Sequence, residues 1–264
     1  MFESRLDVEL FQRELCRSRE RARQLIKNGN VSVDGKVCTK PSYTVNDQSN
    51  IIVTGDIHRY VGRGGLKLEK AVSYFNLNIS DCVCLDIGAS TGGFTDCMLQ
   101  IGALKVYALD VGHSQLDASL IDDDRVINLE NTNIRESHTD DFADRIDFIA
   151  TDVSFISLRL VLPKIKELLS PEGEAVVLIK PQFEAGKDNI GKAGLVKSPS
   201  VHRQILNDIT DFAGKEGFVV YDLCVSPVKG GSGNSEYLMH LKFTDAGKKE
   251  FNIDELINEA LRKE

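Results

Sequence analysis

The stretch Cys84-Leu85-Asp86-Ile87-Gly88-Ala89-Ser90-Thr91-Gly92-Gly93-Phe94 joins an apolar run to a turn of small residues. The apolar run predicts a buried strand that carries Asp86 to the carboxyl edge of a sheet. The glycines let the backbone approach a ligand closely, and a helix that starts near Gly93 offers N–H groups without partners. A strand, a glycine turn and a helix in this order are typical of a nucleotide-type cofactor site in an α/β sheet.

The spacing of acids and glycines narrows the kind of cofactor. A second apolar run, Val106 to Leu109, ends in Asp110, about two dozen residues on, where an acid can bind ribose hydroxyls. A dinucleotide fingerprint would read G-x-G-x-x-G, but here the glycines fall at 88, 92 and 93. Asp86 would also repel a diphosphate, whereas it suits the ammonium group of S-adenosylmethionine (SAM). The pattern therefore favours SAM over NAD.

The residues expected to bind the cofactor follow the ends of the predicted strands. Asp86 and the glycine turn are assigned to the methionine end of SAM, and Asp110 to its ribose. Asn131-Thr132-Asn133 follows the third strand and is assigned to the adenine edge, although an Asn there is more often a turn residue. The full set is Asp86, Gly88, Ala89, Ser90, Gly92, Gly93, Phe94, Asp110, Asn131, Asn133, Asp152 and Phe155.

Composition limits the class of protein. The chain has 264 residues, of which 42% are hydrophobic, enough for a sizeable buried core. Its longest apolar runs, such as Ala175 to Ile179, are strand-sized, and the start Met1-Phe2-Glu3-Ser4-Arg5 has no apolar signal core. The six cysteines include no C-x-x-C pair and the five histidines no H-x-x-x-H spacing. The sequence predicts a globular, cytoplasmic protein with neither a metal site nor a membrane partner.

Charge is distributed unevenly along the chain. The net charge of -8 argues against a nucleic-acid partner, because phosphate contacts need Lys and Arg. Residues 1–57, however, hold nine Lys and Arg against eight Asp and Glu, while the rest holds 23 against 32. The basic side chains are also concentrated within fifteen residues: Arg13, Arg17, Arg19, Arg21, Arg23 and Lys27. A small basic module therefore precedes an acidic domain.

The basic module resembles a known RNA-binding domain. Residues 5–11 and 18–26 predict two short helices, the second capped by Ser18, and Asp34-Gly35 predicts a tight hairpin turn. The patterns R-L-D-x-x-L and S-R-x-x-A-x-x-L-I-x-x-G-x-V-x-V-D-G-K are similar to the S4 RNA-binding domain. In that family the two helices present basic side chains to structured RNA. The residues assigned to RNA are Arg5, Arg17, Arg19, Arg23, Lys27 and Arg63.

The rest of the chain alternates strand-like and helix-like segments, which predicts a mostly parallel, Rossmann-like α/β sheet covered on both faces. The expected organisation is the S4-like α+β domain over 1–57, a linker over 58–63 and a second domain over 64–264. A short Gly/Ser loop joins the last two strands and permits an antiparallel strand at an edge, as in SAM-dependent methyltransferases. The seven strands are expected at 82–86, 104–109, 126–129, 146–151, 174–180, 217–225 and 236–243.

Four further residues have types and places that suit chemistry. Asp152 follows the fourth strand at the carboxyl edge, where open sheets bind ligands. Lys180 ends a run of five apolar residues, so its ammonium needs a carboxylate partner such as Asp152. Glu236 starts the last strand, and Lys67 follows two glycines. Each alone has an ordinary structural explanation, but together they are a candidate catalytic set.

These four residues resemble the K-D-K-E tetrad of FtsJ-like ribose 2'-O-methyltransferases, and the whole chain resembles the TlyA (hemolysin A) family. The resemblance rests on R-G-G-x-K, G-A-S-T-G-G-F-T, D-V-S-F-I-S-L, K-P-Q-F-E and S-G-N-x-E-Y. It implies transfer of a methyl group from SAM to the 2'-hydroxyl of a cytidine in ribosomal RNA, 16S, 23S or both, with ribosomal RNA or subunits as partner. Lys180 would contact the 2'-oxygen, as a general base or as a charge stabiliser.

Three other functions compete with this interpretation. Base methyltransferases that act on amino groups carry Asn/Asp-Pro-Pro-aromatic at the fourth strand, and those that act on cytosine C5 need a nucleophilic Cys. This chain has Asp152-Val153-Ser154-Phe155 there and no Cys at a catalytic edge. A pore-forming haemolysin would need an export signal or a membrane anchor. A non-catalytic assembly factor that uses only the S4 module remains an alternative, but it does not explain two lysines and two acids around a cofactor site.

Overall fold

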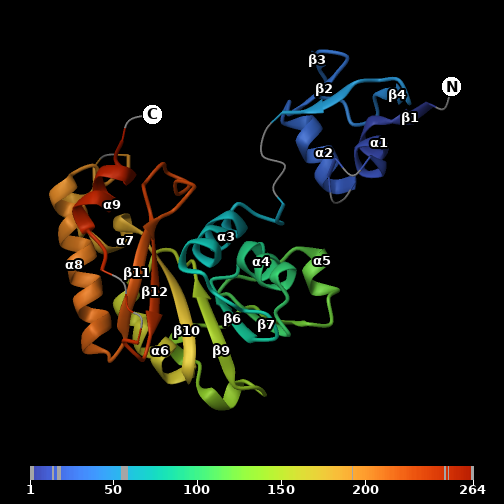
Figure 1. The fold of residues 1–264 in the computed structure, drawn as a ribbon. Helices are drawn as coiled ribbons and strands as arrows, with labels where there is room; N and C mark the ends of the chain where they lie inside the picture. Colours follow the sequence, from blue (N-terminus) through green and yellow to red (C-terminus); the bar gives the residue numbers. More distant parts are fainter. Residues whose placement is uncertain are drawn as a thin grey trace. The chain divides into compact units, whose positions relative to one another are not determined.

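The computed structural model describes residues 3–13, 15–16, 19–54, 59–191, 193–246, 248 and 250–262. The chain divides into two compact units, Met1–Arg59 and Tyr60–Glu264 (Figure 1). Two residues from the sequence analysis, Arg17 and Ser18, lie outside the described residues, as does the segment 55–58 of the expected boundary. Residues 60–63, expected as the end of the linker, belong to the larger unit, and Tyr60 is buried there at 2% exposed.

The smaller unit consists of two helices and two small antiparallel sheets. One sheet pairs β1 with β4, and the other has the order β3-β2-β5. The expected hairpin turn is confirmed, because Asp34 and Gly35 both have positive φ (50° and 78°), as a two-residue turn requires. The elements are β1 Glu3–Arg5, α1 Leu6–Gln12, α2 Arg19–Lys27, β2 Val31–Val33, β3 Lys36–Val37, β4 Thr44–Asn46 and β5 Ile51–Val53.

Apolar side chains of both helices and of the strands form the core of this unit. Leu6 and Leu10 of α1 and Ile26 of α2 are completely buried and pack with Val31 of β2. The spacing of Leu6 and Leu10 places them on one helix face, which is why a short, charged helix can still dock. Arg19 and Lys27 of α2 are exposed.

The larger unit alternates helices and strands, as expected from the sequence. The strands lie within one or two residues of the expected ranges, except that β10 begins earlier, directly after α6. The elements are α3 Gly64–Phe75, β6 Val83–Ile87, α4 Gly93–Ile101, β7 Lys105–Leu109, α5 Ala118–Ile121, β8 Val126–Leu129, β9 Ile146–Thr151, α6 Leu162–Leu168, β10 Leu169–Ile179, α7 Pro181–Glu184, α8 Pro199–Lys215, β11 Val219–Val225, β12 Tyr237–Lys242 and α9 Ile253–Ala260.

The strands of the larger unit form one seven-stranded sheet in the order β11-β12-β10-β9-β6-β7-β8. The strands β8, β7, β6, β9 and β10 are parallel, and β12 runs antiparallel to both of its neighbours. The expected antiparallel last strand is therefore confirmed, but the expectation that it lies at an edge is wrong. The short loop folds β12 back between β10 and β11, and β11 becomes the edge strand.

Helices cover both faces of this sheet, which explains its nearly continuous apolar strands. One core contains Leu68 of α3, Met98 of α4 and Leu120 of α5, and the other contains Ile165 of α6 and Leu206 of α8. Figure 1 shows the sheet between α3 and α4 on one side and α8 and α9 on the other. Within the described ranges, no helix has the length and apolar character that crossing a membrane requires.

Candidate active site

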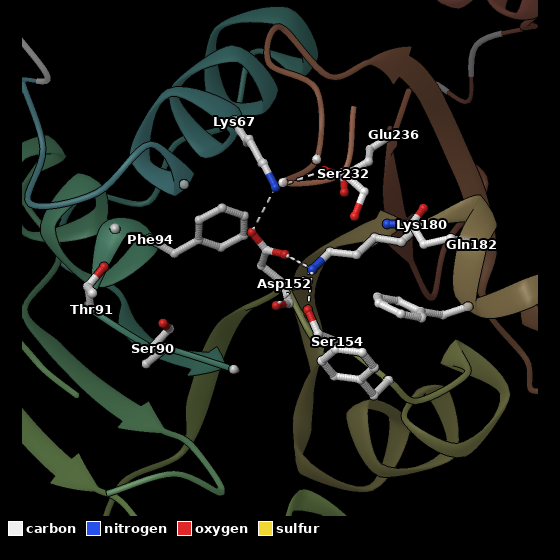
Figure 2. A pocket seen from close by; sticks show the side chains of 18 of the residues that line it. Lys67, Ser90, Thr91, Phe94, Asp152, Ser154, Lys180, Gln182, Ser232 and Glu236 are labelled. Atoms are coloured by element: carbon white, nitrogen blue, oxygen red, sulfur yellow. Dashed lines mark hydrogen bonds and ion pairs between the residues drawn. The ribbon is translucent and has the colours of Figure 1, made fainter. Parts of the chain in front are cut away.

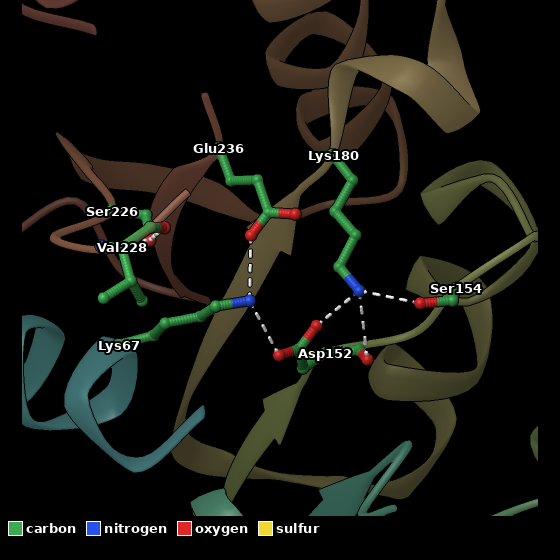
Figure 3. A network of polar contacts seen from close by, with 7 residues as sticks. All are labelled: Lys67, Asp152, Ser154, Lys180, Ser226, Val228 and Glu236. Carbon is green, nitrogen blue, oxygen red and sulfur yellow. Dashed lines mark hydrogen bonds and ion pairs between the residues drawn. The ribbon is translucent and has the colours of Figure 1, made fainter. Parts of the chain in front are cut away.

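The four candidate catalytic residues meet at the carboxyl edge of the sheet. Asp152 directly follows β9, Lys180 directly follows β10, and Glu236 directly precedes β12. Because β10 lies between β9 and β12, these chain ends are neighbours, and the antiparallel direction of β12 brings its start to the same edge. Lys67 reaches them from the second turn of α3. Figure 3 shows the four side chains pointing toward one another.

Their charges alternate along a chain of ion pairs. Lys67 Nζ lies 2.8 Å from Glu236 Oε2 and 3.0 Å from Asp152 Oδ2, so it bridges the two acids. Asp152 Oδ1 in turn lies 2.5 Å from Lys180 Nζ. Glu236 is only 2% exposed, and both lysines are 8% exposed. A buried ionic network of this kind persists only when each charge is paired.

Lys180 has three hydrogen-bond acceptors around its Nζ. Besides the carboxylate of Asp152, they are the backbone carbonyl of Asp152 at 3.5 Å and the hydroxyl of Ser154 at 2.9 Å. Three acceptors match the three protons of an ammonium group. The sequence analysis includes Ser154 in the motif D-V-S-F but gives it no role. Its position two residues after Asp152, the acid at the end of a strand, was the feature that could have indicated one.

The pKa values of Asp152 and Lys67 favour the charged forms of these two residues. Burial alone would raise the pKa of Asp152, but the charges of Lys67 and Lys180 outweigh burial and lower it. Burial alone would likewise lower the pKa of Lys67, but Asp152 and Glu236 outweigh burial and raise it. Asp152 and Lys67 are thus both ionised around neutral pH, and Lys67 is therefore a poor proton acceptor.

Two cavities meet at this network. The first, of about 560 Å³, is lined by all four candidate catalytic residues, by the loop Gly88–Thr91 and by Gln182, Phe183 and Gly230 to Ser232 (Figure 2). The second, of about 450 Å³, is lined by Asp110, Asn133, Arg135 and apolar side chains such as Ile134 and Ile156. Five residues line both: Gly88, Ser90, Asp152, Ser154 and Phe155. The site therefore has room for two ligands that meet beside Asp152 and Ser154.

The glycine turn, residues 88–93, separates the cavities from the rest of α4. Gly88 and Gly92 have positive φ values of 85° and 92°, which explains their identity. A Cβ on Gly92 would lie 2.2 Å from Leu120, and one on Gly93 would lie 2.9 Å from the backbone nitrogen of Gly65. The start of α4 thus packs directly against the start of α3. Of the predicted turn residues, Gly92 lines neither cavity, whereas Gly88, Ala89, Ser90, Gly93 and Phe94 do.

Asp86 supports the turn from beneath and lines neither cavity. Its side chain is completely buried, and its Oδ2 accepts hydrogen bonds from the backbone and the hydroxyl of Thr95, at 2.9 and 2.7 Å. Its Oδ1 has no hydrogen-bond partner among the described residues. Burial raises the pKa of Asp86 to about 7. The predicted contact between Asp86 and the methionine end of SAM stays a prediction, and Asp86 is not among the residues that line the cavities.

The raised pKa of Asp86 predicts how stability varies with pH. The folded state holds the proton more tightly than the unfolded state, so the contribution of Asp86 to stability is lost as pH rises toward 7. Asp86→Asn, which keeps an acceptor for Thr95, removes this loss. From pH 5 to pH 8, we expect the difference in the free energy of unfolding between variant and wild type to grow by roughly 3 kcal/mol in favour of the variant. Denaturant unfolding measures both proteins. Parallel pH profiles of the two proteins would contradict this.

Of the remaining cofactor candidates, two line the second cavity and one is a turn residue outside both cavities. Asp110 lines the second cavity, and its oxygens accept from the backbone N–H groups of Ser90 (2.8 Å) and Gly112 (2.7 Å). Asn133 lines the same cavity and caps a short turn by accepting from the backbone N–H of Arg135. Asn131 lines neither cavity and has a φ of 56°, as a turn residue does. Arg135, which sequence reasoning missed, is a charged neighbour of Asn133 in this cavity.

Phe155 lies where the two cavities meet, with an unusual conformation. It is 90% exposed, has a φ of 64°, and its ring centroid lies 5.1 Å from that of Phe183. An aromatic residue in the left-handed region costs about 1–3 kcal/mol, and such strain is concentrated at functional sites. Sequence reasoning named Phe155 but missed Phe183 and Gln182, although all of them stand in the motifs that follow Asp152 and Lys180.

The residues assigned to RNA lie on the surface of their units. Arg5, Arg19 and Lys27 are exposed in the smaller unit, where Arg23 is partly buried, and Arg63 is exposed at the start of α3 in the larger one. Arg5, Arg19 and Arg23 all form ion pairs with Asp7. Arg17 lies outside the described part of the chain.

Two protein-family models match the chain: the FtsJ-like methyltransferase family over residues 60–243 and the S4 domain over residues 4–51. Hemolysin A of Brachyspira hyodysenteriae is 42% identical over 237 residues, 89% of this chain and 98% of that protein. The 16S/23S rRNA (cytidine-2'-O)-methyltransferase TlyA of Mycobacterium tuberculosis is 38% identical over 260 residues, 98% of this chain and 97% of that protein. These similarities include both units.

A solved structure is similar over the same extent. The structure of a Streptococcus thermophilus protein assigned as a hemolysin matches with a TM-score of 0.77 and 44% identity. The match covers 98% of this chain and 95% of that one. The order of a small N-terminal unit and a seven-stranded sheet is therefore shared with an experimentally determined structure.

Proposed function

The chain belongs to the TlyA (hemolysin A) family of FtsJ-like methyltransferases with an S4 domain, and we propose that it methylates the 2'-hydroxyl of a cytidine in ribosomal RNA. The single observation that carries the proposal is the network of Lys67, Asp152, Lys180 and Glu236 beside two adjoining cavities. A ribosomal substrate also implies that the enzyme acts in the cytoplasm.

The second cavity suits the adenosine part of SAM, which supplies the methyl group. It offers a carboxylate, an amide and apolar walls, the mixture that a nucleoside needs. The carboxylate oxygens of Asp110 each accept one backbone hydrogen bond and keep lone pairs for ribose hydroxyls. The turn Gly88–Thr91 would then hold the methionine part, with Asp86 acting through the start of α4 and not by contact. The residues present therefore fit the cofactor.

The first cavity suits the ribose that receives the methyl group. A ribose hydroxyl that reaches Lys180 must replace one of its three acceptors, and the carbonyl of Asp152, at 3.5 Å, is the weakest. We expect the ammonium to donate to the 2'-oxygen and to orient its lone pair toward the methyl group. When bound, SAM would supply the methyl group, and its sulfur would keep the electron pair of the broken sulfur–methyl bond. The hydroxyl proton, which alkylation makes strongly acidic, would pass to solvent water. The three-acceptor geometry supports Lys180 as a charge stabiliser over Lys180 as the base.

The exposed Phe155 and its neighbour Phe183 suit contact with the target base. Aromatic faces bind splayed-out RNA bases by stacking. Both rings line the first cavity, and Phe155 also lines the second. The basic side chains of the S4 unit supply phosphate contacts elsewhere on the RNA. Arg5, Arg19, Arg23, Lys27 and Arg63 remain our candidates for those contacts, together with Arg17.

Two alternatives fit the site less well. A base methyltransferase would need a nucleophilic thiol or an amide-rich strand end beside the donor, but the first cavity is lined by lysines and carboxylates. A non-catalytic assembly factor would leave the buried ionic network without a purpose, although forming it carries a desolvation cost.

The proposal is tested by mapping 2'-O-methyl groups. Ribosomal subunits from bacteria that lack the enzyme are incubated with the protein and tritiated SAM, and labelled nucleosides are separated after digestion. We expect label in 2'-O-methylcytidine. Label in a methylated base would support the first alternative, and no label on either subunit or on naked RNA would support the second.

A further inference from the structure

The smaller unit contains a carboxylate that is buried among arginines. Asp7 lies in the first turn of α1 and is 0% exposed. Its Oδ1 lies 2.8 Å from Arg5 Nε, and its Oδ2 lies 3.1 Å from Arg5 Nη2 and 3.1 Å from Arg23 Nε. Arg19 Nη2 adds a contact at 3.5 Å. One buried acid thus contacts three arginines from two segments of the chain.

The contacts are strong enough to fix the geometry of this arginine cluster. Arg5 binds Asp7 in the two-pronged arrangement that matches a guanidinium to a carboxylate. Hydrogen bonding to Arg5 lowers the pKa of Asp7 to about 2, with further contributions from Arg23 and Arg19. Asp7 is therefore ionised throughout the physiological pH range, and the contacts do not depend on pH there.

The arginines are nevertheless accessible from outside. Their side chains are 50% (Arg5), 48% (Arg19) and 41% (Arg23) exposed, whereas the carboxylate is covered. A guanidinium has five N–H donors in a flat fork. Asp7 accepts two hydrogen bonds from Arg5 and one from Arg23, and it forms an ion pair with Arg19. With one acid and three arginines the cluster keeps a charge of +2. This is a fixed, positive and half-exposed surface.

Arg13, another arginine of the smaller unit, uses its guanidinium differently. Arg13 donates to the carboxylate of Glu9, to the carbonyl of Ser49 and to the carbonyl of Asn46. Its guanidinium is thereby used to attach α1 to β4 and the turn that follows. In the cluster around Asp7, by contrast, Arg5 and Arg23 share one buried carboxylate as an acceptor.

We infer that Asp7 is a positioning residue that holds Arg5, Arg19 and Arg23 as a preformed site for the phosphates of an RNA backbone. This inference rests on the proposed function and extends it. Long arginine side chains lose conformational freedom when they bind phosphate, and a fold that fixes them beforehand lowers that cost. Asp7 itself does not touch the RNA, since phosphate repels it and the arginines cover it.

For the substitution Asp7→Asn, a positioning role of Asp7 and the change in net charge predict opposite changes in RNA affinity. Asp7→Asn removes a negative charge from an RNA-binding surface, so charge alone predicts tighter binding. The amide, however, presents an N–H group where a carboxylate oxygen accepted, and the arginines are released. We expect the affinity for ribosomal subunits to fall by about tenfold.

Asp47→Asn is the matched control, because Asp47 is an exposed acid of the same unit and forms no ion pair among the described residues. It changes the net charge by the same amount, and we expect its affinity to equal or exceed that of wild type. All proteins are used as full chains, and binding to purified ribosomal subunits is measured at several salt concentrations. Asp7→Asn should also give a shallower dependence of affinity on salt, since fewer phosphates are bound together.

A variant that keeps the positive charge tests whether misfolding explains a loss of binding. Arg5→Lys keeps the charge at a half-exposed position but cannot form the fork with Asp7. We expect it to raise the KM for subunits severalfold and to leave kcat unchanged, and a thermal unfolding scan should show that the variant is folded at the assay temperature. If Asp7→Asn and Asp47→Asn both bind as well as wild type or better, or if Arg5→Lys leaves KM unchanged, the inference is wrong. Wild-type protein that binds no subunits would instead contradict the proposed function.

Discussion

Replacing Lys180 by alanine lowers the rate of methyl transfer by about three orders of magnitude or more, while SAM still binds with nearly unchanged affinity. Lys180 is the residue of the network whose Nζ is expected to donate to the attacking oxygen, so its loss removes a contact made at the reacting centre. It lines the first cavity but not the second, where the adenosine part of SAM is expected. The cofactor contacts therefore survive the change.

Single-turnover transfer of tritiated methyl groups and calorimetric titration with SAM measure the two effects separately. Lys215→Ala is the control, since this lysine is exposed at the end of α8 and lies outside both cavities. We expect the control to match wild type in both measurements. Transfer at a rate within tenfold of wild type by Lys180→Ala would remove Lys180 from the reaction.

Replacing Lys67 by methionine is expected to reduce stability as well as activity. Lys67 is the ion-pair partner that the described residues supply to Glu236, which is 2% exposed. Without it, a carboxylate is left buried and unpaired, at a cost of about 3–5 kcal/mol, or roughly 10 °C in Tm. Asp152 is less affected because it keeps Lys180. Glu236→Gln should cost much less, since Lys67 then retains Asp152.

The double variant Lys67→Met with Glu236→Gln provides the control for this prediction. It removes both charges, so we expect most of the lost stability to return while methyl transfer stays absent. Thermal unfolding of the four proteins in a double-mutant cycle measures the coupling. If Lys67→Met unfolds at the same temperature as Glu236→Gln, the two residues are not paired as described.

The sequence predicted those parts of the molecule that depend on pattern. Apolar runs located every strand of the large sheet, and Asp34-Gly35 located the hairpin of the smaller unit, because local periodicity and turn chemistry determine these features. The four catalytic candidates were selected because each stands at a strand end or beside a glycine turn, and the structure brings their side chains together. A parallel sheet brings such positions to one edge whatever lies between them in the chain.

The parts that were missed depend on packing between distant segments. The insertion of β12 between β10 and β11 is set by pairing, and a short loop alone does not distinguish it from an edge position. The sequence placed Asp86 at the carboxyl edge of the sheet but could not show that its side chain accepts hydrogen bonds from Thr95, because that contact depends on how α4 packs. The arginines of the smaller unit were recognised by charge, whereas the buried acid that holds them looks like any other acid in the sequence.

The most direct test of the account is a crystal structure of the full chain with SAM or its demethylated product. The account predicts adenosine in the cavity lined by Asp110 and Asn133, the amino-acid group at Gly88–Thr91, and the sulfur facing Lys180 across the shared wall. A donor bound elsewhere on the protein, or one whose sulfur faces away from the amine of Lys180, would contradict it.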